Sequence, residues 1–472
     1  MENVNDQICF TENRLAAYDL LIEELIRQQR YPEAIDVSER VKARSFLDIV
    51  AGHSIHVKPT DWEVYQQIQR LQGEKESLQE KKSQLLNINP ENQDQLLLWQ
   101  INQQLNDIET KLNTLLKDYN TVSPELLSLV AVNPTPLAAI QPQLDDDTLV
   151  VDYYVFNDKT VVWIIEKENV NTVVLPIGES RLQPLLVQLR EQLSNPQKTD
   201  YITLLDSLSQ NLIVPLLDFF REKQYIVIIP HRSLNYIPFQ ALIANHHYLV
   251  ENYLLSYAPS LNAYLYSFKK RGHGHSSLLA FGNPAFNDPS LIPLPGAETE
   301  VKEIAHLFHQ PEIHIGSEAT ETQFYQRSGN FDIIHLSTHA MADENFPLYS
   351  MVAFAPDQTN DGYLFAFEVF QLSLNANLVI LSACQTALGQ LSATEGLVGL
   401  SRSFFYAGTP TLIASLWSVN DQSTMELFIQ FYSYWTQGYS KSQALQLAQK
   451  DILARYPHPY YWAPFILIGC EK

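Results

Sequence analysis

The sequence has 472 residues, 46% of them hydrophobic, and a formal net charge of −22. This length exceeds what one hydrophobic core ordinarily serves, so we expect about three domains. The acidic balance argues against a nucleic-acid-binding surface, because contacts to phosphate need clustered lysine and arginine.

The first residues are polar and acidic, unlike a secretory signal peptide, and no apolar run reaches the ~18 residues of a membrane span. The three cysteines (Cys9, Cys384 and Cys470) are too few and too scattered for a disulfide framework. A reducing compartment, the cytoplasm, therefore fits the sequence best.

Residues 1–60 are expected to form a helical segment. Apolar residues recur through it at helical spacing: Leu21, Leu25, Ala34, Val37 and Val41. The spacing resembles that of a tetratricopeptide repeat, although Gln29 stands where a small residue is usual, and an ordinary helical hairpin is the alternative. In either case the helices must pack on another part of the chain, because one repeat cannot bury its own apolar face.

Residues 61–122 are rich in Gln, Glu, Lys and Leu, and their apolar positions step by threes and fours. The first seam is Val64, Ile68, Leu71, Lys75, Leu78, Lys82 and Leu85, and the second is Leu98, Ile101, Leu105, Ile108, Leu112 and Leu115. A short Asn/Pro break at 87–92 separates these heptad patterns, so we predict an antiparallel coiled-coil hairpin. The hairpin would either dock a partner or act as a spacer.

From residue 123 the pattern alternates between strands and helices, which predicts an α/β fold with a parallel sheet. The expected strands are 148–156, 160–165, 171–175, 225–229, 277–281, 312–315, 333–336, 378–381, 411–417 and a last one before Gly469. A Gly/His/Ser-rich loop at 269–277 divides this region into two halves, 123–275 and 276–472.

Three strands in the second half each end in small polar residues, followed by one reactive or charged side chain. These side chains are His339, Cys384 and Asp421. Ligands and chemistry in open α/β sheets gather at the carboxyl ends of the strands. We therefore expect the three residues at one edge of the sheet.

Histidine and cysteine together suit nucleophilic catalysis, in which the thiolate attacks and the imidazole transfers protons. His339 precedes Cys384 by about 45 residues, close to the spacing in caspase-like proteases, and residues 382–385 contain the Ala-Cys-Gln core of their signature. The backbone N–H groups of Ala340 and Cys384 would then form the oxyanion hole.

Several segments resemble the CHAT domain, a caspase-type peptidase domain often found behind tetratricopeptide repeats. They are residues 230–239, 335–340, 381–389, 395–400, 407–408, 415–421 and 461–465. The resemblance covers roughly residues 123–472. It implies a caspase-hemoglobinase fold, in which an inactive caspase-like half precedes the half that carries the catalytic dyad.

The resemblance also implies roles for single residues. His339 would be the general base and acid, and Cys384 the nucleophile. Ala340 departs from the family pattern, in which glycine is common after the histidine; its N–H group remains, but the turn loses conformational freedom.

Asp421 follows the strand after the cysteine strand. Separases, which resemble CHAT domains, use an acidic residue in a similar place to hold arginine, and a carboxylate matches a guanidinium bidentately. The resemblance thus implies cleavage after Arg, with Lys less favoured. The alternative is that Asp421 caps a helix beginning at Ser423. Glu395 would support the pocket or cap its own helix.

Other histidines are assigned no catalytic role. His335 is expected in the core, and His231 ends a strand of the first half without a cysteine partner. The remaining histidines lack zinc-ligand spacing, so the sequence predicts no metal site and no cofactor. No motif for nucleotide or serine hydrolase chemistry occurs.

The sequence therefore predicts a cytoplasmic cysteine endopeptidase that cleaves a protein substrate after Arg. An activating or regulatory protein would gate it at the N-terminal helices. The alternative is a catalytically silent scaffold that assembles proteins through its coiled coil.

Overall fold

The computed structural model describes residues 16–51, 70–71, 74, 78, 81–82, 85, 95–119, 135–270, 277–343, 347–382, 385–386 and 396–470. The chain divides into two compact units. The first, called the α/β unit, comprises Met1–His53 and Ser128–Lys472; the second, called the hairpin unit, comprises Ser54–Leu127.

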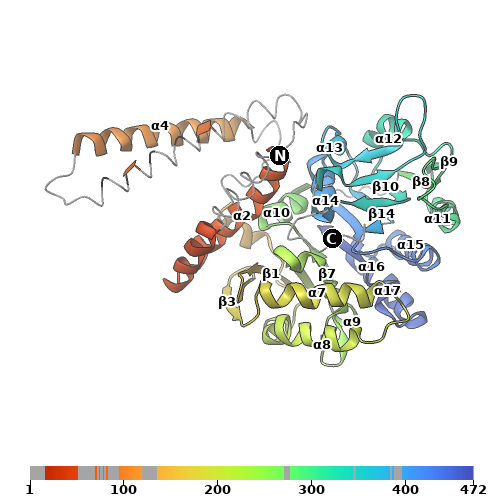
Figure 1. The fold of residues 1–472 in the computed structure, drawn as a ribbon, viewed down its shortest axis with the longest axis horizontal. Coiled ribbons are helices and arrows are strands. Elements are labelled where there is room, and N and C mark those ends of the chain that lie inside the picture. Colours follow the sequence, from red (N-terminus) through yellow and green to blue (C-terminus); the bar gives the residue numbers. More distant parts are fainter. Residues whose placement is uncertain are drawn as a thin grey trace. The chain divides into compact units, whose positions relative to one another are not determined.

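A sheet of eleven described strands forms the centre of the α/β unit, in the order β3-β2-β1-β4-β7-β17-β16-β14-β10-β8-β9 (Figure 1). The first five strands in the chain are β1 (Thr148–Val155), β2 (Thr160–Ile165), β3 (Val170–Leu175), β4 (Tyr225–Ile229) and β7 (Leu254–Tyr257). The others are β8 (Leu278–Pro284), β9 (Glu312–Gly316), β10 (Ile333–Ser337), β14 (Leu378–Leu381), β16 (Thr411–Ser415) and β17 (Phe465–Gly469). The predicted α/β fold class is confirmed.

Most of the sheet consists of two parallel blocks that run in opposite directions, and β2 pairs antiparallel with both β1 and β3. Strands β1, β4, β7 and β17 are parallel to one another, and so are β16, β14, β10, β8 and β9. The blocks meet where β17 pairs antiparallel with β16. The carboxyl ends of the two blocks therefore lie at opposite edges of the sheet.

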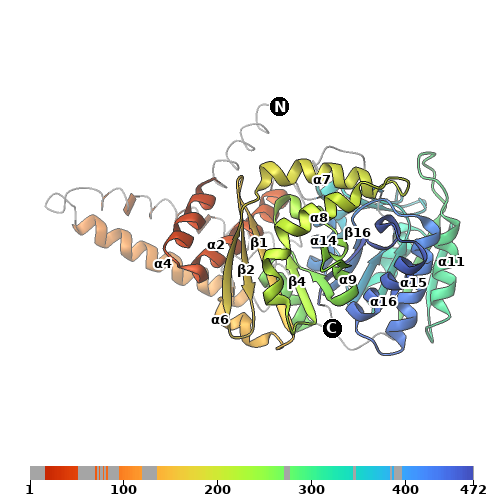
Figure 2. The same ribbon diagram turned by 90° about the horizontal axis from the view of Figure 1, so that it is seen from below.

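Helices cover both faces of this sheet (Figures 1 and 2), which explains why its strands are continuous apolar runs. One face carries α7 (Glu179–Leu193), α8 (Tyr201–Leu212), α16 (Lys441–Arg455), α15 (Asp421–Thr436) and α11 (Pro295–Ala305). The other face carries α2 (Tyr31–Ala51), α10 (Leu261–Lys270), α14 (Gly396–Tyr406) and α12 (Glu321–Arg327). Lys269 and Lys270, expected in a loop, end α10 instead.

A second, four-stranded sheet of the order β13-β12-β11-β15 was not predicted. Its strands are β11 (Ala340–Ala342), β12 (Met351–Ala353), β13 (Tyr363–Phe365) and β15 (Gln385–Thr386). Strand β11 begins directly after His339, so this small sheet adjoins the candidate site.

The predicted N-terminal helices are present as a helix over 16–27 and α2. Their buried residues, Ile22, Leu25, Ala34, Ile35 and Val41, pack in one core with residues of β1, β2 and β4. The expectation that this pair packs on another part of the chain is confirmed. The expectation for Leu21 was wrong: it is 45% exposed, and Ile22 is buried instead.

The turn between the two helices explains why a small residue is usual at position 29. Gln29 has a φ of 58°, in the left-handed region that favours glycine. The glutamine therefore carries a modest backbone strain that the packed helices hold in place.

Two buried carboxylates take part in the contacts that hold α2 against the rest of the α/β unit. Lys42 pairs with Asp152 on β1, and burial raises the pKa of Asp152 while the lysine opposes that rise. Glu39 accepts hydrogen bonds from the backbone N–H groups of Leu261 and Asn262, at 3.1 Å each, at the start of α10. The helix pair is thus an integral part of this fold.

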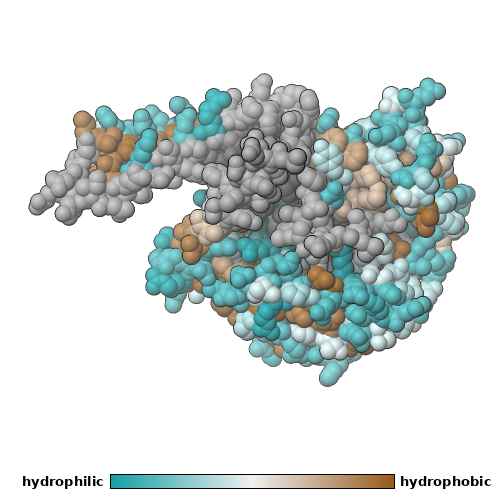
Figure 3. Space-filling view, in the orientation of Figure 1, coloured by the Kyte–Doolittle hydropathy of each residue, from teal (hydrophilic) through white to brown (hydrophobic). Residues whose placement is uncertain are grey.

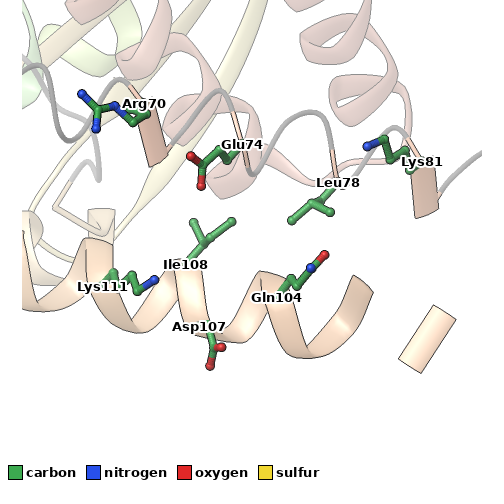
Figure 4. Close-up of a pocket in the computed structure, with 8 residues that line it drawn as sticks. All are labelled: Arg70, Glu74, Leu78, Lys81, Gln104, Asp107, Ile108 and Lys111. Atoms are coloured by element: carbon green, nitrogen blue, oxygen red, sulfur yellow. The ribbon is translucent and has the colours of Figure 1, made fainter. Parts of the chain in front are cut away.

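The hairpin unit contains α4 (Gln95–Tyr119), whose predicted seam residues Leu98, Ile101 and Ile108 are buried. Described residues of the preceding helix face it across a pocket lined by Arg70, Glu74, Leu78, Lys81, Gln104, Asp107, Ile108 and Lys111 (Figure 4). Arg70 lies opposite Lys111, and Leu78 lies opposite Gln104, so the two segments run antiparallel. The predicted seam residues Leu112 and Leu115 have side chains outside those described.

Hydrophilic residues predominate on the described surface in Figure 3, with a hydrophobic patch over α4. On α4, Leu96 is 66% exposed and Trp99 is 60% exposed. Among the described helices, none combines the length and apolar character needed to cross a membrane.

Candidate active site

Two of the predicted site residues, His339 and Asp421, follow parallel strands whose carboxyl ends lie at the same edge of the sheet. Strand β14 lies between β10 and β16, and all three run in the same direction. His339 follows β10, Ser382 follows β14, and Asp421 follows β16. Cys384 and Glu395 lie outside the residues that the structure describes.

The imidazole of His339 is nearly buried, at 4% exposure, and has a defined partner. Its Nε2 lies 2.8 Å from the backbone oxygen of Ile292. A carbonyl can only accept a hydrogen bond, so Nε2 must carry the proton. In the neutral ring Nδ1 then holds the free lone pair, which is the form that a general base requires.

The segment that presents Ile292 is held at several points between β8 and α11. The Leu294 amide donates to Asn283 Oδ1 at 2.7 Å, and the Tyr363 hydroxyl donates to Asp288 Oδ2 at 3.0 Å. The ring of Phe286 lies 5.1 Å from the His339 ring. These contacts fix the carbonyl that orients the histidine.

Ala340 opens β11 and is 3% exposed. It is not among the residues with positive φ, so alanine fits this backbone as well as glycine would. In the small sheet Met341 pairs in parallel with Gln385. This register brings the residue after Cys384 next to the strand that starts directly after His339.

The alternative role predicted for Asp421, as the cap of a helix that starts at Ser423, is wrong. Helix α15 already begins at Asp421, and Asn420 is the N-cap, because its side chain accepts from the Ser423 amide at 3.0 Å. The Asp421 carboxylate instead accepts from the Gly296 amide of α11 at 2.7 Å.

Gly296 is required for this contact. A Cβ atom at that position would lie 2.5 Å from the carboxyl carbon of Asp421. The first turns of α11 and α15 therefore converge on one half-buried carboxylate. Helix N-termini carry partial positive charge, which favours an anion at this point.

The expectation for His335 is confirmed, because its side chain is fully buried and paired with Glu300. His231 follows β4 and thus lies at the opposite edge of the sheet from His339. The sequence reasoning missed Ile292, whose contribution is a backbone oxygen and leaves no mark in residue type.

Residues 203–470 match the family model described as the CHAT domain, and the chain belongs to this family. The match covers the candidate site and most of the sheet around it.

Two curated proteins are similar over about half of the chain. Tetratricopeptide repeat protein 28 of Homo sapiens is 26% identical over 305 residues, which is 53% of this chain and 12% of that protein. Its counterpart from Mus musculus is 25% identical over 303 residues, again 53% of this chain and 12% of the relative. The matched part spans only about an eighth of these relatives.

Two kinds of solved structure share similarity with the chain at low identity. The separase of a Saccharomyces cerevisiae separase–securin complex has a TM-score of 0.49 at 11% identity, over 84% of this chain and 37% of the other. The Arg-specific cysteine proteinase gingipain R has a TM-score of 0.41 at 10% identity, over 62% of this chain and 74% of the other. At these scores the likenesses carry no conclusion about activity.

Proposed function

We propose that this chain is a cysteine endopeptidase, with His339 as general base and acid and Cys384 as nucleophile. The observation that carries the proposal is the hydrogen bond from His339 Nε2 to the Ile292 oxygen, 2.8 Å long, at the edge where the strand before Cys384 ends. This bond leaves Nδ1 as the basic nitrogen of the neutral ring. The first half of the sheet would be structural and the second half catalytic, with their boundary at 275/276.

The reaction follows from these groups. His339 Nδ1 takes the proton from the Cys384 thiol, and the thiolate attacks the carbonyl carbon of the scissile peptide. The imidazolium then returns the proton to the leaving amine, giving an acyl-enzyme thioester that water hydrolyses with the same base. The Ile292 oxygen accepts from Nε2–H throughout, and so stabilises the imidazolium without a carboxylate partner.

The Ala340 and Cys384 amides are the proposed donors to the oxyanion. Ala340 supports this role because it is buried beside the general base and its backbone conformation does not require glycine. Donors held in place before the reaction stabilise the developing charge at no reorganisation cost.

Asp421 is proposed to select arginine before the scissile bond. Its Oδ2 accepts from Gly296, and a carboxylate has a second oxygen and further lone pairs to receive a guanidinium. Its place after β16, adjacent to β14, supports a pocket beside the nucleophile. Glu395 is proposed only as a support of that pocket.

A peptide library incubated with the full chain tests the peptidase activity. We expect cleavage after Arg by the unaltered protein and none by Cys384→Ala, with a His231→Ala protein as a control that still cuts. If neither the unaltered protein nor Cys384→Ala cleaves any peptide when candidate partners are supplied, the peptidase proposal is wrong and the scaffold alternative takes its place.

Gating by a partner protein at the helical regions is the second part of the proposal. Leu96 and Trp99 on α4 support it, because large apolar side chains exposed to this extent are typical of binding surfaces. We expect Leu96→Glu with Trp99→Glu to leave the basal cleavage rate unchanged and to abolish stimulation by the partner. Stimulation that survives both changes would assign the partner to another surface.

A catalytic thiol of this kind also fits the reducing cytoplasm.

A further inference from the structure

Glu300 on α11 is a fully buried carboxylate beneath the candidate site. Its Oε1 lies 2.6 Å from Ser382 Oγ and 2.6 Å from His335 Nε2. His335 is fully buried and Ser382 is 2% exposed. One oxygen atom thus joins a side chain of β10 and a side chain directly after β14 to a helix.

The chemistry of the cluster assigns the donors. The Ser382 hydroxyl donates to Oε1, and the same carboxyl oxygen accepts from the imidazole Nε2–H of His335. The Tyr432 hydroxyl lies 3.3 Å from His335 Nδ1 and closes the other side of the ring. Within the described part of the chain, Glu300 Oε2 has no hydrogen-bond partner.

Stability alone does not explain a carboxylate in this place. Burying one costs several kcal/mol even after relaxation, and an apolar residue of similar volume often serves the fold as well or better. Glu300 is hydrogen-bonded through only one of its two carboxyl oxygens. Its presence in the core is therefore better explained by the side chains that it positions than by a contribution to the stability of the fold.

The two side chains that Glu300 joins stand just before the proposed dyad. His335 is on β10, four residues before His339, and Ser382 follows β14, two residues before Cys384. The Ser382 amide also donates to the Leu336 oxygen at 2.9 Å, so the strand ladder continues to this point. Glu300 adds a side-chain link between the same two strands.

The same helix also reaches the orienting carbonyl of the site. Helix α11 packs tightly on β8, where a Cβ at Gly282 would lie 2.6 Å from the Val301 side chain. The segment directly before α11 contains Ile292, the acceptor of His339. Fixing α11 against β10 and β14 thus fixes the acceptor relative to both dyad strands.

We propose that Glu300 is a positioning residue: the two hydrogen bonds that its Oε1 accepts hold α11 against the ends of β10 and β14 and so set the geometry between His339 and Cys384. This inference rests on the proposed dyad. It assigns Glu300 no contact with substrate. A misplacement of about 1 Å in such a site can cost on the order of a hundredfold in rate.

Two substitutions at Glu300 separate hydrogen bonding from packing. Glu300→Gln keeps an accepting oxygen, while Glu300→Met keeps a comparable volume without one. Glu303→Gln, on the exposed side of the same helix, is the matched control. Each full-length variant is checked for folding by thermal unfolding and near-ultraviolet circular dichroism.

The first measurement is the rate of Cys384 alkylation by iodoacetamide against pH, which needs no peptidase activity. An ordinary cysteine has a pKa of about 8.5, and a histidine partner moves the inflection lower. We expect the inflection to rise by about half a pH unit or more in Glu300→Met, toward that of His339→Ala, because the dyad is misaligned. Glu300→Gln and Glu303→Gln should keep the unaltered profile.

The second measurement is the steady-state cleavage of an Arg peptide. We expect kcat to fall about tenfold or more in Glu300→Met while KM stays within about twofold, the pattern of a lost transition-state geometry. If Glu300→Met does not fold, Ser382→Ala removes one of the two bonds and should shift the alkylation profile in the same direction.

The outcomes distinguish this inference from the proposed function. A folded Glu300→Met protein whose alkylation profile and kcat are unaltered would overturn the positioning role and leave the peptidase proposal standing. Equal losses of kcat in Glu300→Gln and Glu300→Met would have the same meaning. An unaltered protein that cuts nothing, yet shows a profile that His339→Ala and Glu300→Met both shift, would support the positioning role without peptidase activity. If His339→Ala shifts nothing, the dyad fails, and the positioning role fails with it.

Discussion

The two parallel blocks of the sheet each place a histidine after a strand, yet the two rings make opposite kinds of hydrogen bond to the backbone. His231, after β4, accepts a hydrogen bond at Nδ1 from the Val155 amide at 3.0 Å and stacks on Tyr154 at 4.4 Å. His339, after β10, instead donates from Nε2 to a backbone oxygen. An amide consumes the basic lone pair of a ring, whereas a carbonyl leaves it free.

Electrostatics strengthens this contrast. Burial, together with the nearby cations of Arg232 and Lys42, lowers the pKa of His231 well below its usual range. A ring that stays neutral and has its lone pair occupied serves as a structural acceptor. The type of the backbone partner, more than the position at a strand end, thus separates a structural histidine from a candidate base.

The largest expected effect comes from replacing each of the two histidines separately with alanine. His339→Ala should lower kcat about a thousandfold, because a general base typically contributes 10²–10⁴. His231→Ala should leave kcat of the folded protein unchanged and cost about 1–3 kcal/mol of stability through the unpaired Val155 amide. Peptide cleavage and urea unfolding of both variants measure the difference, and equal losses of kcat would contradict the contrast.

The next largest effect concerns the face of the first block that α2 covers. Lys42→Met should destabilise the α/β unit by about 3–5 kcal/mol, because it leaves Asp152 buried without its cation. Arg27→Met, which breaks an exposed pair with Glu24, is the control and should leave the stability almost unchanged. Urea unfolding measures both, and a loss at Lys42 as small as the control would show that Asp152 takes up a proton when its cation is removed.

A smaller effect is expected at the strand end after β16. Asp421→Asn keeps an oxygen for the Gly296 amide and loses the charge, so preference for Arg over Gln peptides should fall about 10–100-fold. Glu426→Gln, on the same helix and outside the site, should change nothing. Ratios of kcat/KM for the paired peptides measure the preference; an unchanged ratio in Asp421→Asn refutes the pocket assignment.

The smallest effect is a pH dependence of stability in the second block. Burial, with the charge of Glu368, raises the pKa of Glu321 to about 7. Between its ordinary pKa of 4.5 and about 7 the folded state retains a proton that the unfolded state releases, so this carboxyl's stabilising contribution is lost as pH rises through that window. Glu321→Gln should therefore exceed the unaltered protein in stability at pH 8, by about 1–2 kcal/mol, and not at pH 4.5.

The amide of the Gln side chain can still accept from the Gly362 N–H group, which Glu321 Oε2 accepts at 3.1 Å. Urea unfolding at a series of pH values measures the gap between the two proteins. A gap that stays constant from pH 4.5 to pH 8 would assign the effect to packing.

Long apolar runs made the large sheet predictable. Strands β10, β14 and β16 lie within a residue or two of their predicted ranges, because a buried parallel strand has to be apolar on both faces. The small sheet was missed because its strands of two or three residues are too short to carry a periodicity. Strand β7 was missed because Ser256 interrupts its four residues, which are not a continuous apolar run like those of β14.

The candidate site was predictable only in part. His339 and Asp421 could be assigned to one sheet edge because they follow apolar runs. Ile292 acts through a backbone oxygen, and the contact between Asp421 and Gly296 joins positions 125 residues apart. Neither a backbone group nor a distant pair is visible in a single sequence.

Strand β17 has a consequence for the order in which the molecule is assembled. It follows every other described strand in the sequence, yet it lies at the middle of the sheet, between β7 and β16. A ribosome therefore synthesises all the other strands of both blocks before the strand that joins them. The candidate base at His339 is attached to a complete sheet only after residues 465–469 have emerged, so a protein shortened before this point would lack the strand that joins its two blocks.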